Sequence, residues 1–582
     1  MTVAARVWRA AVVLGVLLIV AFGAIAPPER CPSVTSAELR RSAQAAVDWF
    51  VRNQYANGSW LYEYHRDDDS STPEYNDVRH AGAVMALYQA AEAGLPGALR
   101  SADRGTEWAL DRLTERDDWA AVTVDGRTTT GTTALLVAGL DYRRAATGDT
   151  RYDGLMRRLG RFLVGQIEPS GAVLAFYDTG ADRPLPDEYS KYYTGEAYWA
   201  LARLARTFGD EDFGPAASRI GAYLATARDD EEGYWPPIAD HWAEYGMSET
   251  LPLTQAELAY ARRQAELWGG QARWVQQRFG PWGAAVRGPD VFRGGWYGVM
   301  NEGFTGLWRI ARAEPELADI EGTIAARASC IAGLAVREQA SAADAASARD
   351  PSRVEGAWFF DDGVTRMDDQ QHALAALLRT RAIVEAGTLD ADDGDAPSVW
   401  LWALALLLAL NPARASFGIP RSGRSSREVA WLCAVGGALG ALAICACAVL
   451  GDPLLDALDV STPAFRTAAG VVALLAGATD LFRRPPRPDP ALPGRRAALV
   501  PVALPLVARP TLLVMALSAG ADQGVLVALV AVLAGVAALT AFAVRIRIDG
   551  PSGRTLRWAA RLLAAGLVAC GVLLTIDGIL SV

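Results

Sequence analysis

Carboxylates, histidines and aromatic residues gather in five short stretches, each at the start of an apolar helical run. The stretches read YEYHRDDDSSTPEYNDVRHAG, DEYSKYYTGEAYW, ADHWAEYGMSE, GGWYGVMNEGF and DDGVTRMDDQQH. Cleavage of a glycosidic bond needs two carboxyl groups, one as acid and one as base or nucleophile. Aromatic faces on which sugar rings stack must stand nearby. The stretches supply both, and the expected catalytic carboxylates are Asp77, Glu196, Asp240 and Glu302.

The same stretches supply the expected substrate-binding residues. These are Glu74, Arg79, His80, Tyr189, Tyr193, His241, Trp242, Trp296, Asn301, Asp369 and His372. The alternative is that the acids cap helices and the aromatic residues pack the core, and the sequence leaves both readings open. The four histidines form no His-x-x-x-His pair, so we expect no metal and no cofactor. Asp368, Asp369 and His372 are a weaker candidate ligand set.

Apolar spacing and helix breakers predict about twelve helices between residues 31 and 390, arranged in six pairs. The first members are expected at 37–54, 99–113, 151–166, 211–226, 253–279 and 315–338. The second members are expected at 77–93, 129–147, 193–208, 240–249, 296–313 and 368–386. The second helices begin with Ala and Gly, and small residues permit close inner packing. Six outer and six inner helices predict an all-α fold, an (α/α)6 toroid.

A recurring motif joins these helices. It reads Gln54, Gly58 and Trp60 in QYANGSW, and partial copies recur around Gln166, Gly233, Gly280 and Gly356. Gln can satisfy frayed backbone groups at a helix end and Gly permits the turn. We therefore interpret the motif as a structural clasp between repeats.

The spacing Gln-x-x-x-Gly-x-Trp resembles the QW repeat of triterpene cyclases, and the layout of residues 36–390 is similar to the six-hairpin glycosidases. Both resemblances imply a toroid. The stretch LDADDGD also carries Asp390, Asp392 and Asp393, spaced like the protonating motif of class II terpene cyclases. It follows the last inner helix, where we interpret residues 391–397 as an acidic linker.

Two regions are apolar enough for a membrane. Residues 1–30 are expected to be an uncleaved N-terminal transmembrane anchor, and residues 398–582 a membrane domain. Its six expected spans are 399–419, 429–450, 463–482, 497–518, 524–544 and 556–580. Arginines cluster in alternate connections, so the positive-inside rule places the toroid outside the cytoplasm. The spans predict a cell membrane, and the richness in Arg and Ala with a single lysine indicates a bacterial one.

The six spans form two halves of opposite orientation. The first span of each half has a polar, proline-containing break, in LALNPARASFGIP and PVALPLVARPTLL, and the third span of each ends near an aspartate. Broken helices at matching places point to a transporter site. The expected site residues are Asn411, Arg414, Asp480, Arg509 and Asp577.

The segments AFRTAAGVVALLAGATDLF and LVPVALPLVARPTLLVMAL resemble the MarC family and its LysE-like relatives. The resemblance implies a six-span domain in two inverted repeats. The family has a Gly-Pro-Gly after the second break, where this chain has Ala508, Arg509 and Pro510. A multi-span anchor that transports nothing is the alternative.

Residues 31–395 hold 37 Lys plus Arg against 56 Asp plus Glu, a net charge of −19. This charge repels phosphates, so nucleic acid is not an expected partner. In an oxidising compartment, Cys31 and Cys330 are expected to form a disulfide.

The leading functional hypothesis is a membrane-anchored, glycosidase-like protein that processes envelope or imported glycans. One alternative is a non-catalytic toroid that binds a ligand or partner for the membrane domain. Another is a terpene-cyclase-like enzyme.

Overall fold

The computed structural model describes residues 3–209, 212–235, 237–279, 283–285, 294–387, 397–458, 460–487, 494–546 and 551–581. The chain divides into two compact units. The first contains residues 1–30, 273–289 and 393–581, and the second contains residues 31–272 and 290–392. We call them the membrane unit and the toroid unit, and the linker expected at 391–397 falls almost entirely outside the described residues.

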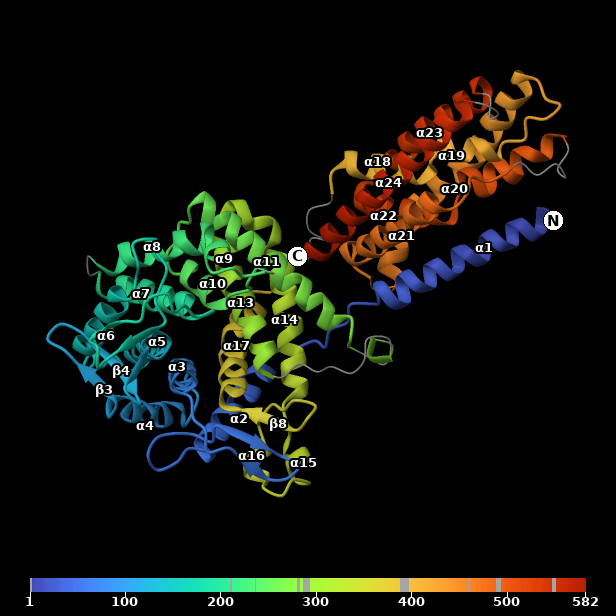
Figure 1. Cartoon of the computed structure of the whole chain (residues 1–582). Helices are drawn as coiled ribbons and strands as arrows, with labels where there is room; N and C mark the ends of the chain where they lie inside the picture. Colours follow the sequence, from blue (N-terminus) through green and yellow to red (C-terminus); the bar gives the residue numbers. More distant parts are fainter. Residues whose placement is uncertain are drawn as a thin grey trace. The chain divides into compact units, whose positions relative to one another are not determined.

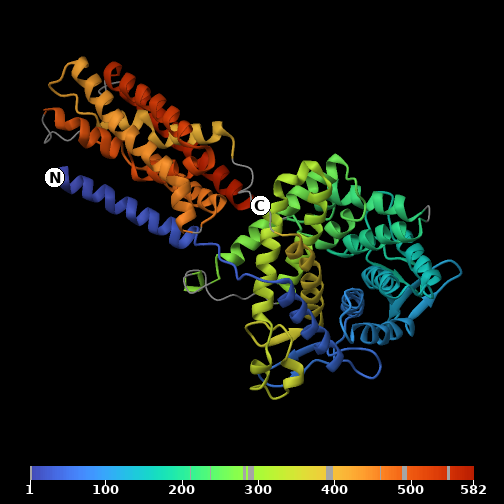
Figure 2. The same ribbon diagram turned by 180° about the vertical axis from the view of Figure 1, so that it is seen from behind.

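Six helices form the inner ring of the toroid unit (Figures 1 and 2). They are α3 (Asp77–Glu92), α5 (Thr130–Thr147), α7 (Tyr193–Phe208), α10 (His241–Met247), α13 (Gly294–Ala313) and α17 (Met367–Ala386). Each packs against the next, and α17 packs back on α3, so the ring is closed. The (α/α)6 toroid expected from the sequence is therefore confirmed.

The outer layer consists of the helix that precedes each inner one. These helices are α2 (Ser36–Arg52), α4 (Ala98–Leu110), α6 (Asp153–Gly165), α8 (Phe213–Thr226), α11 (Gln255–Gln276) and α14 (Glu321–Glu338). The 3-10 helix η2 (Pro315–Ile320) precedes α14, and the short helices α9 (Arg228–Glu231), α15 (Ala342–Ala345) and α16 (Pro351–Val354) lie in connections. A buried stripe on α2, including Leu39, Ala43, Ala46, Val47 and Phe50, has the spacing of one helix face.

The QW-type motif is a clasp between neighbouring outer helices. Gln54 lies just after α2, and its Nε2 donates to the carbonyl oxygens of Gly58 (3.0 Å) and Ser101 on α4 (2.9 Å). The Ser101 hydroxyl donates back to Gln54 Oε1 at 2.9 Å. Gly58 has φ +90°, a conformation that needs glycine. Trp60 is fully buried beside His80.

The same clasp closes the ring between the last and first repeats. Gln339 Nε2, after α14, donates to Gly356 O (2.9 Å) and to Ser42 O on α2 (3.0 Å). The Ser42 hydroxyl donates to Gln339 Oε1 at 2.7 Å. Sixteen residues separate this Gln from its Gly, so the motif spacing does not reveal it. By contrast, Trp235 of the DDEEGYW copy is 90% exposed, so its ring is not buried as that of Trp60 is.

Short strands lie in the connections between helices, and the helical spacing of apolar residues does not predict them. One sheet has the order β2-β1-β8, with β1 (Glu63–His65), β2 (Ser70–Ser71) and β8 (Val364–Arg366). The other has the order β3-β4-β5-β6-β7, with β3 (Leu113–Glu115), β4 (Ala120–Val124), β5 (Arg127–Thr129), β6 (Phe176–Asp178) and β7 (Arg183–Pro184). Antiparallel pairing of β1 with β8 joins the first and last repeats. A disulfide between Cys31 and Cys330 joins the segment before α2 to α14.

The membrane unit contains six helices long and apolar enough to cross a bilayer, or seven if one bent pair counts as a span. The six are Trp8–Ile25, Val399–Gly418, Ser426–Leu458, Thr462–Phe482, Val525–Arg545 and Ser552–Leu580. The bent pair is Gly494–Val507 with Pro510–Gln523, at 63°. The sequence predicts one N-terminal span followed by six others, which agrees with seven spans when the bent pair is counted as one.

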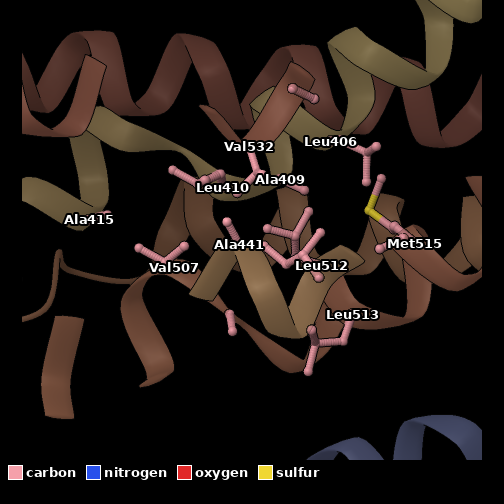
Figure 3. Close-up of a cluster of buried hydrophobic side chains, with 14 of the residues drawn as sticks. Leu406, Ala409, Leu410, Ala415, Ala441, Val507, Leu512, Leu513, Met515 and Val532 are labelled. Carbon is pink, nitrogen blue, oxygen red and sulfur yellow. The ribbon is translucent and has the colours of Figure 1, made fainter. Parts of the chain in front are cut away.

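These spans correspond to labelled elements. The first covers α1 (Val3–Val20) and the π-helix η1 (Ala21–Ile25), and the second covers α18 (Val399–Leu410), α19 (Pro412–Ala415) and η3 (Ser416–Gly418). The others are α20 (Ser426–Leu458), α21 (Thr462–Phe482), η4 and η5 (Gly494–Val507) with α22 (Pro510–Gln523), α23 (Val525–Arg545) and α24 (Pro551–Leu580). Buried residues of several of these spans form an apolar core, where Leu406, Leu410, Leu512 and Val532 lie together (Figure 3).

Candidate functional site

A cavity of about 520 Å³ lies in the toroid unit at the N-terminal ends of inner helices. Its volume is in the range of small-molecule sites. It is lined by Asn76, Val78, Arg79, Leu135, Ser190, Tyr192, Tyr193, Glu196, His241, Trp242, Gly295, Trp296, Val299, Phe360, Asp368, Asp369, Gln371 and His372. Eight of the residues expected from the sequence are therefore brought to one cavity: Arg79, Tyr193, Glu196, His241, Trp242, Trp296, Asp369 and His372.

Close helix packing brings two histidines and a glutamate together. A Cβ on Gly298 of α13 would lie 2.3 Å from the backbone of His372, so glycine lets α17 approach α13. A Cβ on Gly303 would lie 2.5 Å from Trp268, which allows the same approach on the other side. As a result, His372 Nδ1 lies 2.6 Å from Glu302 Oε2, and His241 Nε2 lies 3.8 Å from the same oxygen.

The two imidazoles have opposite electrostatic surroundings. Burial lowers the pKa of His241 well below its usual value, and the nearby positive charge of His372 lowers it further. Burial also disfavours the charged form of His372, but the charge and hydrogen bond of Glu302 outweigh it and raise its pKa. These opposite shifts favour a neutral His241, which can accept a proton, and a protonated His372, which can donate one. Both nitrogens of His241 are buried without a hydrogen-bond partner among the described residues.

Glu196 is a neutral acid on the same cavity wall. Burial, with the charge of Asp240 adding to it, raises the pKa of Glu196 to about 8. Its Oε2 has no hydrogen-bond partner in the described part of the chain. A buried carboxylic acid in this state can donate a proton or a hydrogen bond at neutral pH.

The other three expected catalytic carboxylates do not line the cavity. Asp240 caps α10 through the amide of Trp242 and forms a buried ion pair with Arg228. Asp77 accepts hydrogen bonds from Thr129 (2.9 Å) and Thr132 (2.6 Å). Glu302 contacts His372 and His241 through its Oε2 atom. Each of these carboxylates is thus occupied with other side chains.

Four of the expected binding residues also lie away from the cavity. His80 is buried between Tyr75 (2.7 Å) and the Gly105 carbonyl (2.8 Å), and burial lowers its pKa to about 3. Asn301 is buried and donates to Thr380 at 2.8 Å. Tyr189 donates to Glu168 at 2.7 Å on the surface, and Glu74 is exposed. For these residues, packing, capping and solvation account for the polar side chains.

His241, Glu302 and His372 also lie close enough together to bind one metal ion. One ligand atom from each lies within 4.8 Å of the others. Two histidines and one glutamate are a known ligand set for catalytic zinc. No sequence motif reveals this set, because the three residues lie on three different helices. In the weaker candidate ligand set, the two aspartates make other contacts. Asp368 pairs with Arg79 at 3.0 Å, and Asp369 caps α17.

In the membrane unit, the two helix breaks converge on one aspartate. Arg414, beside the first break, lies 2.9 Å from Asp480 Oδ1, and Arg509, at the second break, binds the two oxygens at 2.8 and 3.0 Å. Asn411 has φ +47° and caps the short helix that carries Arg414. The expected residues Asn411, Arg414, Asp480 and Arg509 thus form one polar group between the breaks.

Asp577 belongs to a separate group. Arg466 Nη1 contacts Asp577 at 2.8 Å, while Arg466 Nη2 contacts the buried side chain of Asp522 at 2.7 Å. Arg466 and Asp522 were not expected as site residues. Arg466 lies within an apolar span, and this position was the available signal.

Comparison with known proteins agrees with the expected layout of the membrane domain. Residues 433–582 match the MarC family, described as integral membrane proteins. This confirms the resemblance seen in the sequence, and the apolar spans imply contact with a lipid bilayer. No curated protein matches the chain.

Several solved structures are similar to the toroid unit. Cellobiose 2-epimerase from Spirochaeta thermophila is 15% identical with a TM-score of 0.41, and the match covers 65% of this chain and 98% of that one. An unsaturated glucuronyl hydrolase specific for heparin is 11% identical with a TM-score of 0.41, covering 60% and 98%. A type II terpene cyclase from Scytonema is 16% identical with a TM-score of 0.35, covering 60% and 98%. The terpene-cyclase-like aspartates at 390, 392 and 393 lie outside the described residues.

Proposed function

We propose that the toroid unit binds a carbohydrate and transfers protons on it, with His241 as base and His372 as acid. The observation that carries the proposal is that two histidines line one cavity in opposite surroundings: His372 is hydrogen-bonded to Glu302, whereas both ring nitrogens of His241 lack a hydrogen-bond partner among the described residues. Titratable groups whose surroundings push their pKa values apart are the pattern of an acid–base pair. Trp242, Trp296 and Tyr193 on the wall provide faces for a sugar ring.

The charge state of the wall favours proton transfer at carbon over glycoside hydrolysis. Hydrolysis passes through an oxocarbenium-like state, which a carboxylate stabilises. Here Glu196 is protonated and Asp368 is paired with Arg79. Removal of a proton next to a sugar carbonyl instead develops negative charge on oxygen, which hydrogen-bond donors and cations stabilise. Glu196, Arg79 and His372 are such groups, so we propose an isomerase- or epimerase-type reaction.

Hydrolysis remains the second candidate because Glu196 also meets one of its requirements. A carboxyl group with a pKa raised to about 8 is protonated at neutral pH, as the general acid of a glycosidase must be. Asp368 would be its partner if substrate displaced Arg79. Hydrolysis and isomerisation give different products, so one sugar panel separates them.

We further propose that the toroid unit lies outside the cytoplasm and that the membrane domain is transporter-like, because its two helix breaks meet at Asp480. The basis is the distribution of arginines between alternate connections and the disulfide between Cys31 and Cys330.

The test is turnover of a panel of reducing sugars and oligosaccharides by the full chain in detergent. His241→Asn and His372→Asn are each expected to lower kcat/KM at least a hundredfold, the usual worth of acid–base catalysis. His65→Asn is the matched control, because His65 lies outside the cavity lining. Equal activity in all three variants would overturn the acid–base assignment.

Metal analysis distinguishes the acid–base pair from a metal centre. If His241, Glu302 and His372 hold an ion, the purified chain carries about one metal per molecule and Glu302→Gln removes it. The acid–base proposal predicts activity that survives chelation. Activity lost on chelation and restored by one metal would replace it.

A further inference from the structure

A second cavity, in the membrane unit, is lined mainly by arginines. It measures about 620 Å³, and its arginines are Arg414, Arg483, Arg484, Arg487, Arg557 and Arg561. One acidic residue, Asp480, lines it as well. Six positive charges against one negative charge leave a strongly cationic hollow. The proposed sugar chemistry does not use this cavity.

Three separate elements deliver these arginines. Arg483, Arg484 and Arg487 follow the end of α21, while Arg557 and Arg561 lie four residues apart on α24 and so share one helix face. Arg414 comes from α19 beside the first helix break. Convergence of three elements distinguishes this hollow from a single basic loop at a membrane surface.

Arg414 has a fixed structural task. Its guanidinium donates to the carbonyl oxygens of Asp480 (3.2 Å), Arg483 (2.9 Å) and Arg484 (3.1 Å), and it pairs with the Asp480 carboxylate. It thereby holds the end of α21 and the turn after it in place. The Asp480 charge is shared between Arg414 and Arg509 and does not neutralise the other arginines.

The remaining arginines keep their charge available to a ligand. Within the described residues, Arg483, Arg484, Arg487 and Arg557 form no ion pair with a carboxylate. Arg561 lies over the ring of Trp558 at 5.6 Å. Guanidinium groups bind phosphate through paired hydrogen bonds, and basic pockets between membrane helices bind phosphate head groups. Phe417, Phe482 and Ala560 add an apolar wall.

We propose that this cavity binds a phosphate-bearing ligand, either a phospholipid head group or a soluble phosphate. The apolar wall accommodates the carbon portion next to the phosphate, and Arg557 with Arg561 contacts the phosphate from one side. The shared chemistry is a phosphate anion held by several guanidinium groups.

The experiment measures binding of two probes to the full chain. Radiolabelled inorganic phosphate is tested by equilibrium dialysis in neutral detergent micelles, and fluorescent phosphatidic acid is tested in phosphatidylcholine nanodiscs. Binding of inorganic phosphate without lipid identifies a soluble ligand. Binding of phosphatidic acid alone, with labelled phosphatidylcholine as reference, identifies a lipid.

The variant pair is Arg557→Gln with Arg561→Gln, and a second pair is Arg484→Gln with Arg487→Gln. The control pair is Arg427→Gln with Arg496→Gln, which removes two exposed arginines outside the cavity lining. Each cavity pair is expected to weaken binding about tenfold or more, and the control pair less than twofold. Equal losses in all three pairs, or no binding of either probe, would overturn the proposal.

Discussion

At the scale of single residues, the candidate site depends on where three protons reside. Burial and the nearby charge of His372 lower the pKa of His241, while the charge and hydrogen bond of Glu302 raise the pKa of His372. Glu196 retains its proton because it is buried near Asp240. None of these states follows from residue type alone, since each depends on side chains from other helices.

The first prediction concerns the pH dependence of turnover. Activity requires neutral His241, so it rises as pH increases through a pKa below 6.5, and it requires charged His372, so it falls as pH increases through a pKa above 6.5. Glu302→Gln removes the charge that raises the pKa of His372. The alkaline limb of kcat/KM should therefore move to lower pH in this variant. An unmoved alkaline limb would show that His372 is not the titrating acid.

The second prediction concerns stability and Glu196. In the unfolded chain this carboxyl group has its usual pKa of 4.5, whereas burial in the folded chain raises its pKa to about 8. The folded state therefore binds more protons between these values, and its stability falls as pH rises through them. Glu196→Gln should reduce the loss of thermal unfolding temperature between pH 5 and pH 9. A loss equal to that of the unaltered chain would contradict the buried neutral acid.

The sequence predicted eight of the residues that line the cavity, but it did not predict which of them interact. His241 and His372 stand out because they lie in polar stretches at or near the starts of inner helices. His80 occupies a similar place in its stretch, yet it bonds to Tyr75 and the Gly105 carbonyl inside the core. Only the packing of a side chain on its neighbours separates these cases.

At the scale of elements, two clasps tie neighbouring outer helices through a glutamine, a serine and a glycine carbonyl. Gln54 with Ser101 and Gln339 with Ser42 make the same set of contacts. The second clasp closes the ring, because it joins the end of the last outer helix to the first.

The third prediction concerns this closing clasp. Gln339→Ala leaves the Ser42 hydroxyl and the Gly356 carbonyl without their partner, which should cost about 1–3 kcal/mol of stability. Gln255→Ala, at an exposed position, is the matched control and should change stability by less than about 0.5 kcal/mol. Thermal unfolding of the full chain in detergent measures both. Similar values for the two variants would show that the clasp adds nothing.

The helices were predictable because the helical spacing of apolar residues and the helix-breaking residues that bound it recur in each of the six repeats. Tyr193–Phe208 matches its expected bounds, and Asp77–Glu92 differs by one residue. The pairing of β1 with β8 was not predictable, since about 300 residues separate the two strands and each has only three. Trp235 illustrates a wrong prediction of the other kind. The sequence resembles the motif there, but the Trp235 ring is exposed.

At the scale of the whole molecule, the chain combines a closed toroid with a set of membrane spans. Hydropathy predicted the spans because each has a long apolar run. The convergence of Arg414 and Arg509 on Asp480 lay beyond sequence reasoning, although the matching breaks pointed to the right segments.

The fourth prediction concerns topology. If the toroid lies outside the cytoplasm, protease added to spheroplasts should cut within residues 31–390. The arginine-rich connection at 420–427 should remain intact until the membrane is permeabilised. Cleavage of the toroid only after permeabilisation would reverse the assignment.

The fifth prediction tests the central claim that two histidines move protons on a carbohydrate. The full chain is incubated in D2O with a panel of reducing sugars, and proton NMR follows the hydrogen on the carbon next to the carbonyl. We expect deuterium to enter that position for at least one sugar, with exchange reduced at least a hundredfold in His241→Asn and His372→Asn and unchanged in His65→Asn. Absence of exchange for every sugar, with new reducing ends released from oligosaccharides, would contradict the account and establish hydrolysis in its place.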